Sequence, residues 1–559
     1  MVRLNLISVL IIVMAAIFFV ISILLPNHYL PWLAAYQEFS SFFYLILLLL
    51  FSVLFLKKLK ITSVIVFFIV LSALPLIQHL FGIIFFIGDA WIVTAYLLFF
   101  AISVLVGFNL FHSDIESKKI IVIVSVLFIF VAIISTWISL WQWLMLPGSI
   151  WIADMPIGGR PFANMGQPNN LATLLCLGLG GVYYLYDRKY LNAISCSFLT
   201  FFIIIGIVLT QSRTPWISAF WVFGVFGYFN LRFSQLPDNF RLSFKWVVCW
   251  VLIYFLLVVS LPFVSDFLMI SNIDLLDRAK SMERLEMYLQ FFTAIVNGPF
   301  WGYGWNQITV AQVNITSAYP VPIPTQYTHN FLLDLLVWNG PFIGSILIVF
   351  LGVWFFYLAC NVYNKESFFA LISICFVLTH AMLEYPHAYA FFIFPVGILL
   401  GGLHSETNPA VVSSVSKVHG FIFVFFLFFL FSVVWSEYRV VEENNRVLRF
   451  EIAKIGRDRT KDYVPDVFIL TQLKAFHEFA RMDPVSGMSH RDIDFMRRVV
   501  YRYPYPSILY RYALALKLND ERDKSEFYLK ILKDLHGDDK YLEAIHIMSE
   551  TFPDEILVN

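Results

Sequence analysis

The chain has 559 residues, of which 60% are hydrophobic and only 14% charged, with a formal net charge of zero. A soluble domain carries about 25% charged residues. The composition therefore excludes a soluble globular enzyme, a disordered protein and a disulfide scaffold, and predicts an all-α polytopic membrane protein. Zero net charge also argues against a nucleic-acid partner, which would need a basic surface.

Thirteen apolar segments approach the length of about 20 residues that a membrane span requires. The apolar N-terminus is interpreted as the first of these spans, because no convincing cleavage site for a signal peptide follows it. The twelfth segment is short enough to be a half-span. The thirteen segments lie near 6–25, 41–56, 61–78, 91–111, 120–140, 169–186, 191–209, 215–231, 246–264, 342–360, 367–383, 390–402 and 418–436.

The distribution of charge predicts the orientation and a domain boundary. With the N-terminus in the cytoplasm, thirteen Lys and Arg residues fall in cytoplasmic loops and only five in the outer loops before the tail, as the positive-inside rule requires. Residues 1–436 hold 18 basic and 16 acidic residues, whereas residues 437–559 hold 20 and 22. We therefore expect a membrane domain over 1–436 and a soluble helical domain over 437–559, which lies in the periplasm if the host is Gram-negative.

Three arginines on the outer side stand out, because basic residues are depleted there. Arg160, Arg213 and Arg284 each lie in or beside an aromatic or apolar segment. Forked guanidinium donors suit phosphate oxygens, so together they indicate an anion site at the membrane surface. The alternative is that they pair with acids such as Glu283 and Glu286, or extend to lipid headgroups.

The outer segment 158–170 is unusually polar for one that leads into an apolar span. Its prolines and glycines keep it out of a regular helix. Gln167, Asn169 and Asn170 can supply hydrogen bonds to a sugar or a phosphate. Alternatively, these amides cap the following helix.

The longest outer loop, at about 265–341, contains a candidate general base. His329 begins an amphipathic segment, where its side chain can face a water-lined cleft and accept a proton near neutral pH. Tyr327 and Asn330 lie on either side of His329, and we assign them to binding of the substrate that His329 acts on. Asp334 lies five positions on, so a helix would not place it on the same stripe. A lone histidine can equally be a satisfied structural residue.

A further outer loop, at 379–387, carries Glu384 and His387. We assign them to acceptor binding or to support of an arginine, and the residues alone do not decide between the two. Metal competes as an explanation, since several histidines lie near the outer face, but no HExxH, CxxC or paired-carboxylate spacing accompanies them. We therefore expect no metal and no cofactor. The five cysteines lie in apolar runs and are interpreted as core or lipid-facing residues.

The tail contains PSILYRYALALKLNDERDKSEFYLKILKDL, which is similar to one degenerate tetratricopeptide-like hairpin. About three repeats are normally needed for an independent solenoid. Its charged face is typical of any solvated helix, and the functional alternative is a platform that docks a partner protein.

Four motifs resemble the O-antigen ligase superfamily and, within it, bacterial protein O-oligosaccharyltransferases. They are GRPFANMGQPNNLAT, QSRTPW, ERLEMYLQFFTAIVNGPFWGYGWNQ and THNFLLDLLVWNG. The segment LPNHYLPWLAAYQE at 25–38 is similar to the short N-terminal motif of the protein-modifying branch.

The resemblance implies an inner-membrane enzyme that takes an oligosaccharide from undecaprenyl pyrophosphate and transfers it en bloc to a protein hydroxyl in the periplasm. The acceptor would be a pilin or another envelope protein. His329 matches the essential loop histidine, and Arg284 matches the arginine before the P-x-x-G-x-G turn. Arg160 and Arg213 match the arginines of the first two motifs, which we expect near the pyrophosphate.

Two other readings stay open. One keeps the chemistry and changes the acceptor, as in a ligase that acts on lipid A core or a polymerase that extends the glycan. The other is a transporter of lipid-linked sugar, although such proteins often contain internal repeats, and the two halves of this chain show none.

Overall fold

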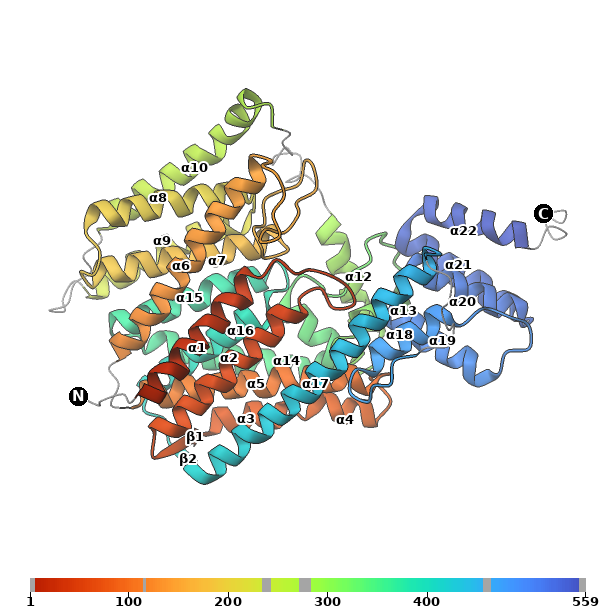
Figure 1. The fold of residues 1–559 in the computed structure, drawn as a ribbon, viewed down its shortest axis with the longest axis horizontal. Helices are drawn as coiled ribbons and strands as arrows, with labels where there is room; N and C mark the ends of the chain where they lie inside the picture. The colour runs from red at the N-terminus through yellow and green to blue at the C-terminus, as the bar shows by residue number, and fades with distance from the viewer. Residues whose placement is uncertain (1–5, 114–116, 234–242, 271–282, 456–463, 552–559) are drawn as a thin grey trace. The chain divides into compact units, whose positions relative to one another are not determined.

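The computed structural model describes residues 6–113, 117–233, 243–270, 283–455 and 464–551, and these are mostly helical (Figure 1). The chain forms two compact units, each assembled from separate stretches of sequence. The first unit contains Met1–Leu71, Tyr96–Lys280 and Val353–Phe431. The second contains Ser72–Ala95, Ser281–Gly352 and Ser432–Asn559.

The first unit is a bundle of apolar helices. Its neighbouring pairs include α1 with α2, α6 with α7 and α8, and α7 with α15. Large aromatic side chains such as Phe128, Phe369 and Phe394 are fully buried between them. Its helices are α1 (Leu6–Leu24), α2 (Ala35–Phe55), α3 (Ser63–Leu71), α6 (Ser117–Trp143), α7 (Pro168–Asp187), α8 (Ala193–Leu209), α9 (Thr214–Phe233), α10 (Phe244–Phe267), α15 (Lys365–Ala381), the short 3-10 helix η1 (Pro386–Ala388) and α16 (Ala390–Glu406).

Three long helices contain residues of both units. They are α5 (Ile87–Phe111), α14 (Phe331–Cys360) and α17 (Lys417–Ile452). The boundary that the charge distribution predicts near residue 437 falls inside α17. The helix continues past the apolar stretch because the charged residues that follow are good helix formers.

A small sheet joins two loops of the first unit and corrects the all-α expectation. Strands β1 (Lys58–Thr62) and β2 (Val411–Ser416) pair antiparallel, with Lys58 opposite Ser416. Asn109 supports β1, because its amide donates to the Lys60 carbonyl at 2.9 Å and its oxygen accepts from the Lys60 N–H at 2.7 Å. The expected span at 61–78 therefore begins in a strand. Its partner lies about 350 residues away, so local sequence patterns do not reveal the pairing.

Among the residues that the structure describes, eight helices are long and apolar enough to cross a membrane, which makes the chain a multi-spanning integral membrane protein. They lie at Leu6–Leu24, Ala35–Phe55, Ser63–Leu80, Ile87–Phe111, Ser117–Trp143, Phe244–Phe267, Phe331–Cys360 and Lys417–Ile452. Two shorter apolar helices, Ala193–Leu209 and Ala390–Glu406, match further expected spans. The remaining three expected spans are helices α7, α9 and α15, which belong neither to the eight long apolar helices nor to the two shorter ones.

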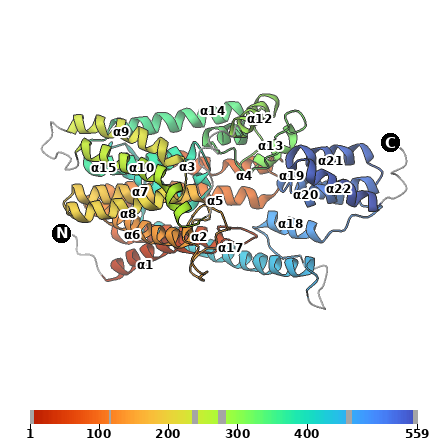
Figure 2. The same ribbon diagram turned by 90° about the horizontal axis from the view of Figure 1, so that it is seen from above.

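The second unit contains the described part of the long loop near 265–341 together with the tail. Besides parts of the three long helices, it contains α4 (Leu74–Leu80), α12 (Glu283–Asn297), α13 (Ile308–Ile315), α18 (Thr471–Arg481), α19 (His490–Arg502), α20 (Pro506–Leu518), α21 (Arg522–His536) and α22 (Asp538–Thr551). Helices α20, α21 and α22 lie side by side in both ribbon views (Figures 1 and 2).

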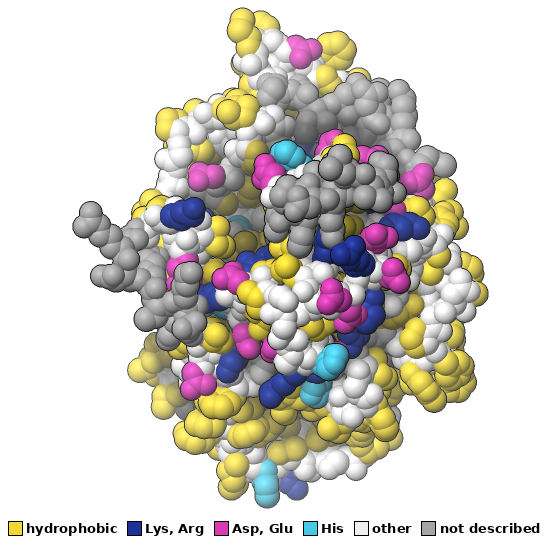
Figure 3. Space-filling view, turned by 90° about the vertical axis from the view of Figure 1, so that its right-hand side faces the viewer, with side chains coloured by type: hydrophobic (Ala, Val, Ile, Leu, Met, Phe, Trp, Pro, Cys, Tyr) yellow, Lys and Arg dark blue, Asp and Glu magenta, His cyan; other side chains and the backbone are white. Residues whose placement is uncertain are grey.

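The tail is helical as predicted, and its apolar core is not self-contained. Phe86 and Val313 belong to the same buried cluster as residues of α18–α22. Helix α19 is started by a capping box, in which Ser489 and Asp492 each accept the other's backbone N–H. Lys and Arg side chains mix with Asp and Glu on the face shown in Figure 3, which is typical of a solvated helical surface.

Candidate functional site

The polar segment before α7 is fixed in place by hydrogen bonds from side chains elsewhere in the first unit. The Gln142 oxygen accepts from the Phe162 and Ala163 N–H groups at 3.0 and 2.8 Å, and its amide donates to the Ala163 carbonyl at 2.9 Å. The amide of Asn164 donates to the Leu24 carbonyl at 2.6 Å. Ala163 has φ of 49°, a strained left-handed conformation that such contacts must maintain.

His28 supports the same segment. Its Nε2 lies 2.9 Å from the Asn164 carbonyl, and a Cβ on Gly166 would lie 3.0 Å from the imidazole ring. Burial lowers the pKa of His28 below its usual value, and its hydrogen bonds to the Asn164 and Leu33 carbonyls oppose that shift. Because a carbonyl oxygen can only accept, Nε2–H is the donor to Asn164. The N-terminal motif at 25–38 thus contacts the motif that carries Arg160.

Two of the predicted anion-binding arginines lie close together. Arg160 Nη1 donates to the Gln211 carbonyl at 3.1 Å, in the turn that contains Arg213. Gln211 has φ of 48°, so this turn is strained as well. Both guanidinium side chains are half-buried. The two motifs therefore share one polar surface in the first unit, although they are about 50 residues apart in sequence.

Glu384 joins this surface through the amides of the first motif. Its carboxylate, only 3% exposed, accepts from Asn169 Nδ2 at 3.0 Å and from Gln167 Nε2 at 3.4 Å. The Asn169 oxygen in turn accepts from the Ser212 hydroxyl at 2.6 Å. Glu384 is therefore in direct contact with the amides of the first motif.

The first-motif amides do not act as simple helix caps. Helix α7 begins at Pro168, and Gln167 at the N-cap position makes no side-chain cap hydrogen bond. Asn170 is fully buried, and its amide lies 3.5 Å from the Met165 carbonyl. His387 lies half-buried in η1, three residues after Glu384. Nearby, the Thr173 hydroxyl lies 2.9 Å from Nδ1 of His380, which joins α7 to α15.

In the second unit, His329 lies in a tight turn immediately before α14. Its φ of 60° is a left-handed conformation that a residue with a Cβ adopts only when its surroundings impose it. The Thr328 N–H donates to Oδ1 of the buried Asp334 at 2.8 Å, and the Thr328 hydroxyl donates to the Asn330 carbonyl at 2.9 Å. Asp334 therefore holds the turn from the first turn of the helix, where the helix dipole favours a carboxylate.

Asn330 starts α14. Its side-chain oxygen accepts from the Leu332 and Leu333 N–H groups at 3.0 and 3.1 Å, which is the geometry of an N-cap. The half-buried Tyr327 lies on the other side of His329, and its ring is nearly perpendicular to the Trp338 ring, with 6.5 Å between the two ring centroids.

Helix α12 places Arg284 on the same side as the His329 turn. The Tyr288 hydroxyl donates to the His329 carbonyl at 3.2 Å. Arg284 precedes Tyr288 by four residues, so the two side chains lie on one face of α12. Arg284 is half-buried. Arg278 and Lys280, the other basic residues of this loop, lie outside the described residues.

Two buried glutamines support the chain that leads to His329. Gln312 on α13 accepts from the Thr325 N–H at 3.1 Å and donates to the Ile323 carbonyl at 2.8 Å. It also donates to Gln290 on α12 at 3.1 Å, and Gln290 donates to the Tyr319 carbonyl at 2.7 Å. Both glutamines have 0% exposure. Their amides therefore satisfy a loop that would otherwise leave buried backbone groups unpaired.

The P-x-x-G-x-G turn packs against a kink in α14. Gly340 interrupts that helix with φ of 73°, just before Pro341. A Cβ on Gly302, whose φ is +77°, would lie 2.3 Å from the Gly340 nitrogen, so only glycine fits. The Gly304 N–H donates to the Trp338 carbonyl at 2.9 Å. The turn thus sets the position of the helix that His329 precedes.

Sequence reasoning missed several of these supports. It set Asp334 apart from His329 by helical phase, whereas the carboxylate reaches the residue before His329. It also passed over Gln142, Gln290 and Gln312, although a glutamine within an apolar helix must find a buried partner. Among the described residues, no group of three His, Cys, Asp or Glu side chains is arranged to hold a metal ion. All five cysteines lie within the described residues, and they form no disulfide.

Two family models match this chain. Residues 198–349, which contain Arg213, Arg284 and His329, match the family described as O-Antigen ligase. Residues 368–546, which contain Glu384 and most of the tail, match the family described as Virulence factor membrane-bound polymerase, C-terminal. The fold and these matches define a multi-spanning membrane protein, part of which is similar to the O-antigen ligase family.

Two curated relatives come from Acinetobacter baylyi. A general O-oligosaccharyltransferase is 29% identical over 552 residues, which cover 96% of this chain and 94% of the relative. A ComP-specific O-oligosaccharyltransferase is 29% identical over 462 residues, or 82% of each chain. The resemblance to bacterial O-oligosaccharyltransferases of the O-antigen ligase superfamily, which the motifs predict, is confirmed.

Proposed function

We propose that this chain is a glycosyltransferase that transfers a preassembled oligosaccharide to hydroxyl groups of proteins. The observation that carries the proposal is the likeness to O-oligosaccharyltransferases over nearly the whole length of both chains. A lipid-linked oligosaccharide is the donor, and undecaprenyl pyrophosphate is its carrier. The acceptors are Ser or Thr residues of a pilin or of other envelope proteins.

We assign the diphosphate to Arg160 and Arg213. The contact of Arg160 with the turn before Arg213 supports this assignment, because it holds the two cations on one surface. Fixed cations stabilise the negative charge that develops on a leaving diphosphate. Gln167, Asn169 and Asn170 bind the glycan or phosphate oxygens, and Glu384 and His387 support this surface or contact the acceptor.

We assign the general base to His329. The strained conformation of its turn supports a catalytic role, because such strain is found where function requires a fixed side chain. The acceptor oxygen attacks the anomeric carbon while the bond from that carbon to the diphosphate oxygen breaks. The hydroxyl proton passes to the imidazole, and the diphosphate leaves with the electron pair. Arg284 stabilises the negative charge, and Tyr327 and Asn330 contact the donor.

A direct displacement inverts the configuration at the anomeric carbon. The linkage in the glycoprotein, determined by nuclear magnetic resonance, should therefore be opposite to the linkage in the donor. Retention of configuration would contradict a single displacement and would require a covalent glycosyl intermediate.

The topology we propose has thirteen spans in the bacterial inner membrane, with the N-terminus in the cytoplasm. Residues 1–436 form the catalytic membrane domain, and residues 437–559 form a tetratricopeptide-like domain in the periplasm. The excess of basic residues in the predicted cytoplasmic loops supports this orientation.

The second candidate function is transfer to lipid A core or polymerisation of O-antigen, and it is favoured by the matches to an O-antigen ligase family and to a membrane-bound polymerase family. To separate the two candidate functions, the purified chain would be placed in liposomes with a lipid-linked oligosaccharide. An envelope glycoprotein and lipid A core would be offered together, and the molecule that receives the glycan would be identified. Glycan on the protein supports the proposal. Glycan only on lipid A core, or longer lipid-linked glycan, would replace it with the second candidate.

A further inference from the structure

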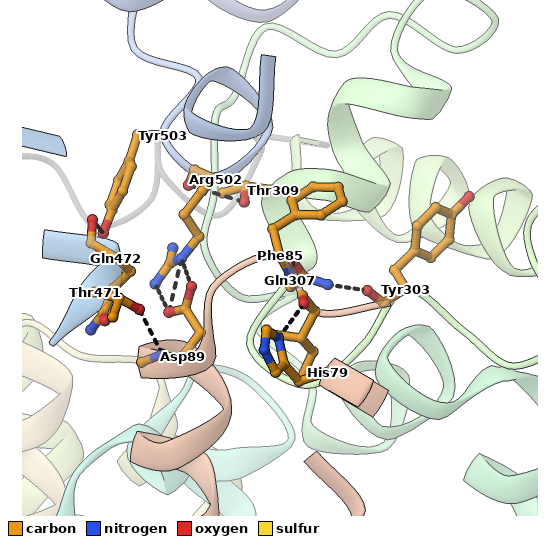
Figure 4. A network of polar contacts seen from close by, with 12 residues as sticks. His79, Phe85, Asp89, Tyr303, Gln307, Thr309, Thr471, Gln472, Arg502 and Tyr503 are labelled. Carbon is orange, nitrogen blue, oxygen red and sulfur yellow. Dashed lines mark hydrogen bonds and ion pairs between the residues drawn. The ribbon is translucent and has the colours of Figure 1, made fainter. Parts of the chain in front are cut away.

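A buried ion pair joins α19 of the tail to the start of α5. Arg502 Nε lies 3.0 and 2.9 Å from the two Asp89 oxygens, and Nη2 lies 2.9 Å from Oδ1 (Figure 4). The side chains are 11% and 1% exposed. Removing both charges from water is costly, so a buried ion pair forms only where the surrounding structure fixes the geometry of the two side chains.

Neighbouring contacts extend this junction. The Thr471 hydroxyl accepts from the Gly88 N–H at 2.9 Å, and the Tyr503 hydroxyl donates to the Gln472 carbonyl at 3.3 Å (Figure 4). The Thr309 hydroxyl on α13 donates to the Arg502 carbonyl at 3.3 Å. The main chain of Arg502 therefore contacts α13 while its side chain binds α5.

Helix α13 is also the helix that supports the approach to His329. Its Gln312 fixes the Ile323 carbonyl and the Thr325 N–H, and the Thr325 hydroxyl donates to the Tyr327 carbonyl at 2.6 Å. At the other end of α13, Gln307 donates to the Ile83 carbonyl at 2.6 Å. Helix α13 is thus hydrogen-bonded to the tail through Thr309 and to the residues before His329 through Gln312.

We propose that Arg502 is a positioning residue for His329, and that the tail helices brace the catalytic loop. The proposal rests on the role of His329 proposed above. The His329 turn is in a strained conformation, and its support on one side comes through α13. Loss of the Arg502–Asp89 bond lets α13 shift, and the histidine then leaves its reactive position. The tail is in this respect part of the catalytic machinery and not only a platform for the acceptor.

The test is Arg502→Gln in the full-length chain, with Arg498→Gln as the matched control. Arg498 lies one turn earlier on α19, is 47% exposed and pairs with Asp494 at the surface. Arg502→Gln should lower kcat about 10- to 100-fold, as expected for a displaced catalytic group, with the donor KM changed less than about twofold. Arg498→Gln should leave kcat unchanged, and Arg502→Lys should restore part of it.

Hydrogen exchange separates this proposal from the role of His329. The Thr325 and Thr328 amides should exchange faster in Arg502→Gln than in Arg498→Gln, because their acceptors are Gln312 and Asp334. If exchange is unchanged, the tail does not support the loop before His329. If exchange is faster but kcat is normal, the tail supports the loop but that support does not contribute to catalysis. Full activity of His329→Ala would instead overturn the proposed base, whatever the exchange data show.

A second variant covers the case in which Arg502→Gln leaves Asp89 buried and the protein fails to fold. Asp89→Ala combined with Arg502→Met removes both charges, and such an exchange of a buried ion pair is often neutral for stability. This double variant should accumulate normally, exchange faster at Thr325 and Thr328, and have a lowered kcat. Normal exchange and normal kcat in this folded variant would contradict the proposal.

Discussion

Removal of the Glu384 carboxylate should impair use of the donor. Its 3.0 Å bond from Asn169 is a charge-assisted hydrogen bond inside the protein, and such bonds contribute about 1.5–3 kcal/mol. The 3.4 Å bond from Gln167 is near the limit for a hydrogen bond and adds little. At about 1.4 kcal/mol for each factor of ten, Glu384→Ala should lower kcat/KM for the donor about 10- to 150-fold. Glu384→Gln, which keeps one acceptor oxygen, should have a smaller effect.

The assay is transfer by purified chain at varied concentrations of lipid-linked oligosaccharide, with the amount of folded protein measured in parallel. Glu406→Ala is the matched control, because that carboxylate also accepts from an asparagine amide, Asn364, at 3.2 Å within the same unit. Glu384→Ala with unchanged kcat/KM would refute the reasoning. An equal loss in the Glu406→Ala variant would show that the effect is general and not a property of this surface.

Three further outcomes are expected. Gly302→Ala should destabilise the fold by about 2–5 kcal/mol through steric overlap and backbone strain, so little folded protein should appear on size-exclusion chromatography. Gly352→Ala is the control, because a Cβ there meets nothing within 4 Å, and it should give a normal amount of folded protein. His28→Ala should lower donor use and His28→Gln should retain more of it, since Gln can still donate to Asn164; equal activity of the two variants would contradict this. Burial, and then Arg481, lower the pKa of His477 to about 4, so the unfolded state takes up the proton first and acid should destabilise the fold by about 3 kcal/mol. This loss should begin below about pH 6.5 and be complete near pH 4. Thermal melting should show this dependence, and His477→Gln should flatten it.

Much of the membrane body could be predicted from the sequence, because a run of apolar residues determines a span locally. The outer arginines and His329 could be selected for a similar reason, since each is a polar group that an apolar context does not explain. The helical tail was also predictable, from its amphipathic periodicity.

The remaining features depend on partners far away in sequence. Nothing in Lys58–Thr62 indicates a strand until Val411–Ser416 is placed beside it. The ion pair of Asp89 with Arg502 joins residues more than 400 positions apart, so neither side chain identifies the other. In the sequence, Gln312 looks like any other glutamine in a helix. Only the tertiary structure shows that it supports the loop before His329. Tertiary structure determines these contacts.

The measurement that tests the account most directly is the intact mass of an acceptor protein. A pilin and a general envelope glycoprotein would each be coexpressed with this chain and a lipid-linked oligosaccharide. His329→Ala would be compared with His546→Ala, a control histidine on the exposed face of α22, 75% exposed and 3.6 Å from Glu550. We predict a mass gain equal to one preassembled glycan, retained in His546→Ala and absent in His329→Ala. A gain that persists in His329→Ala, or no gain on either protein while lipid A core becomes modified, would contradict the account.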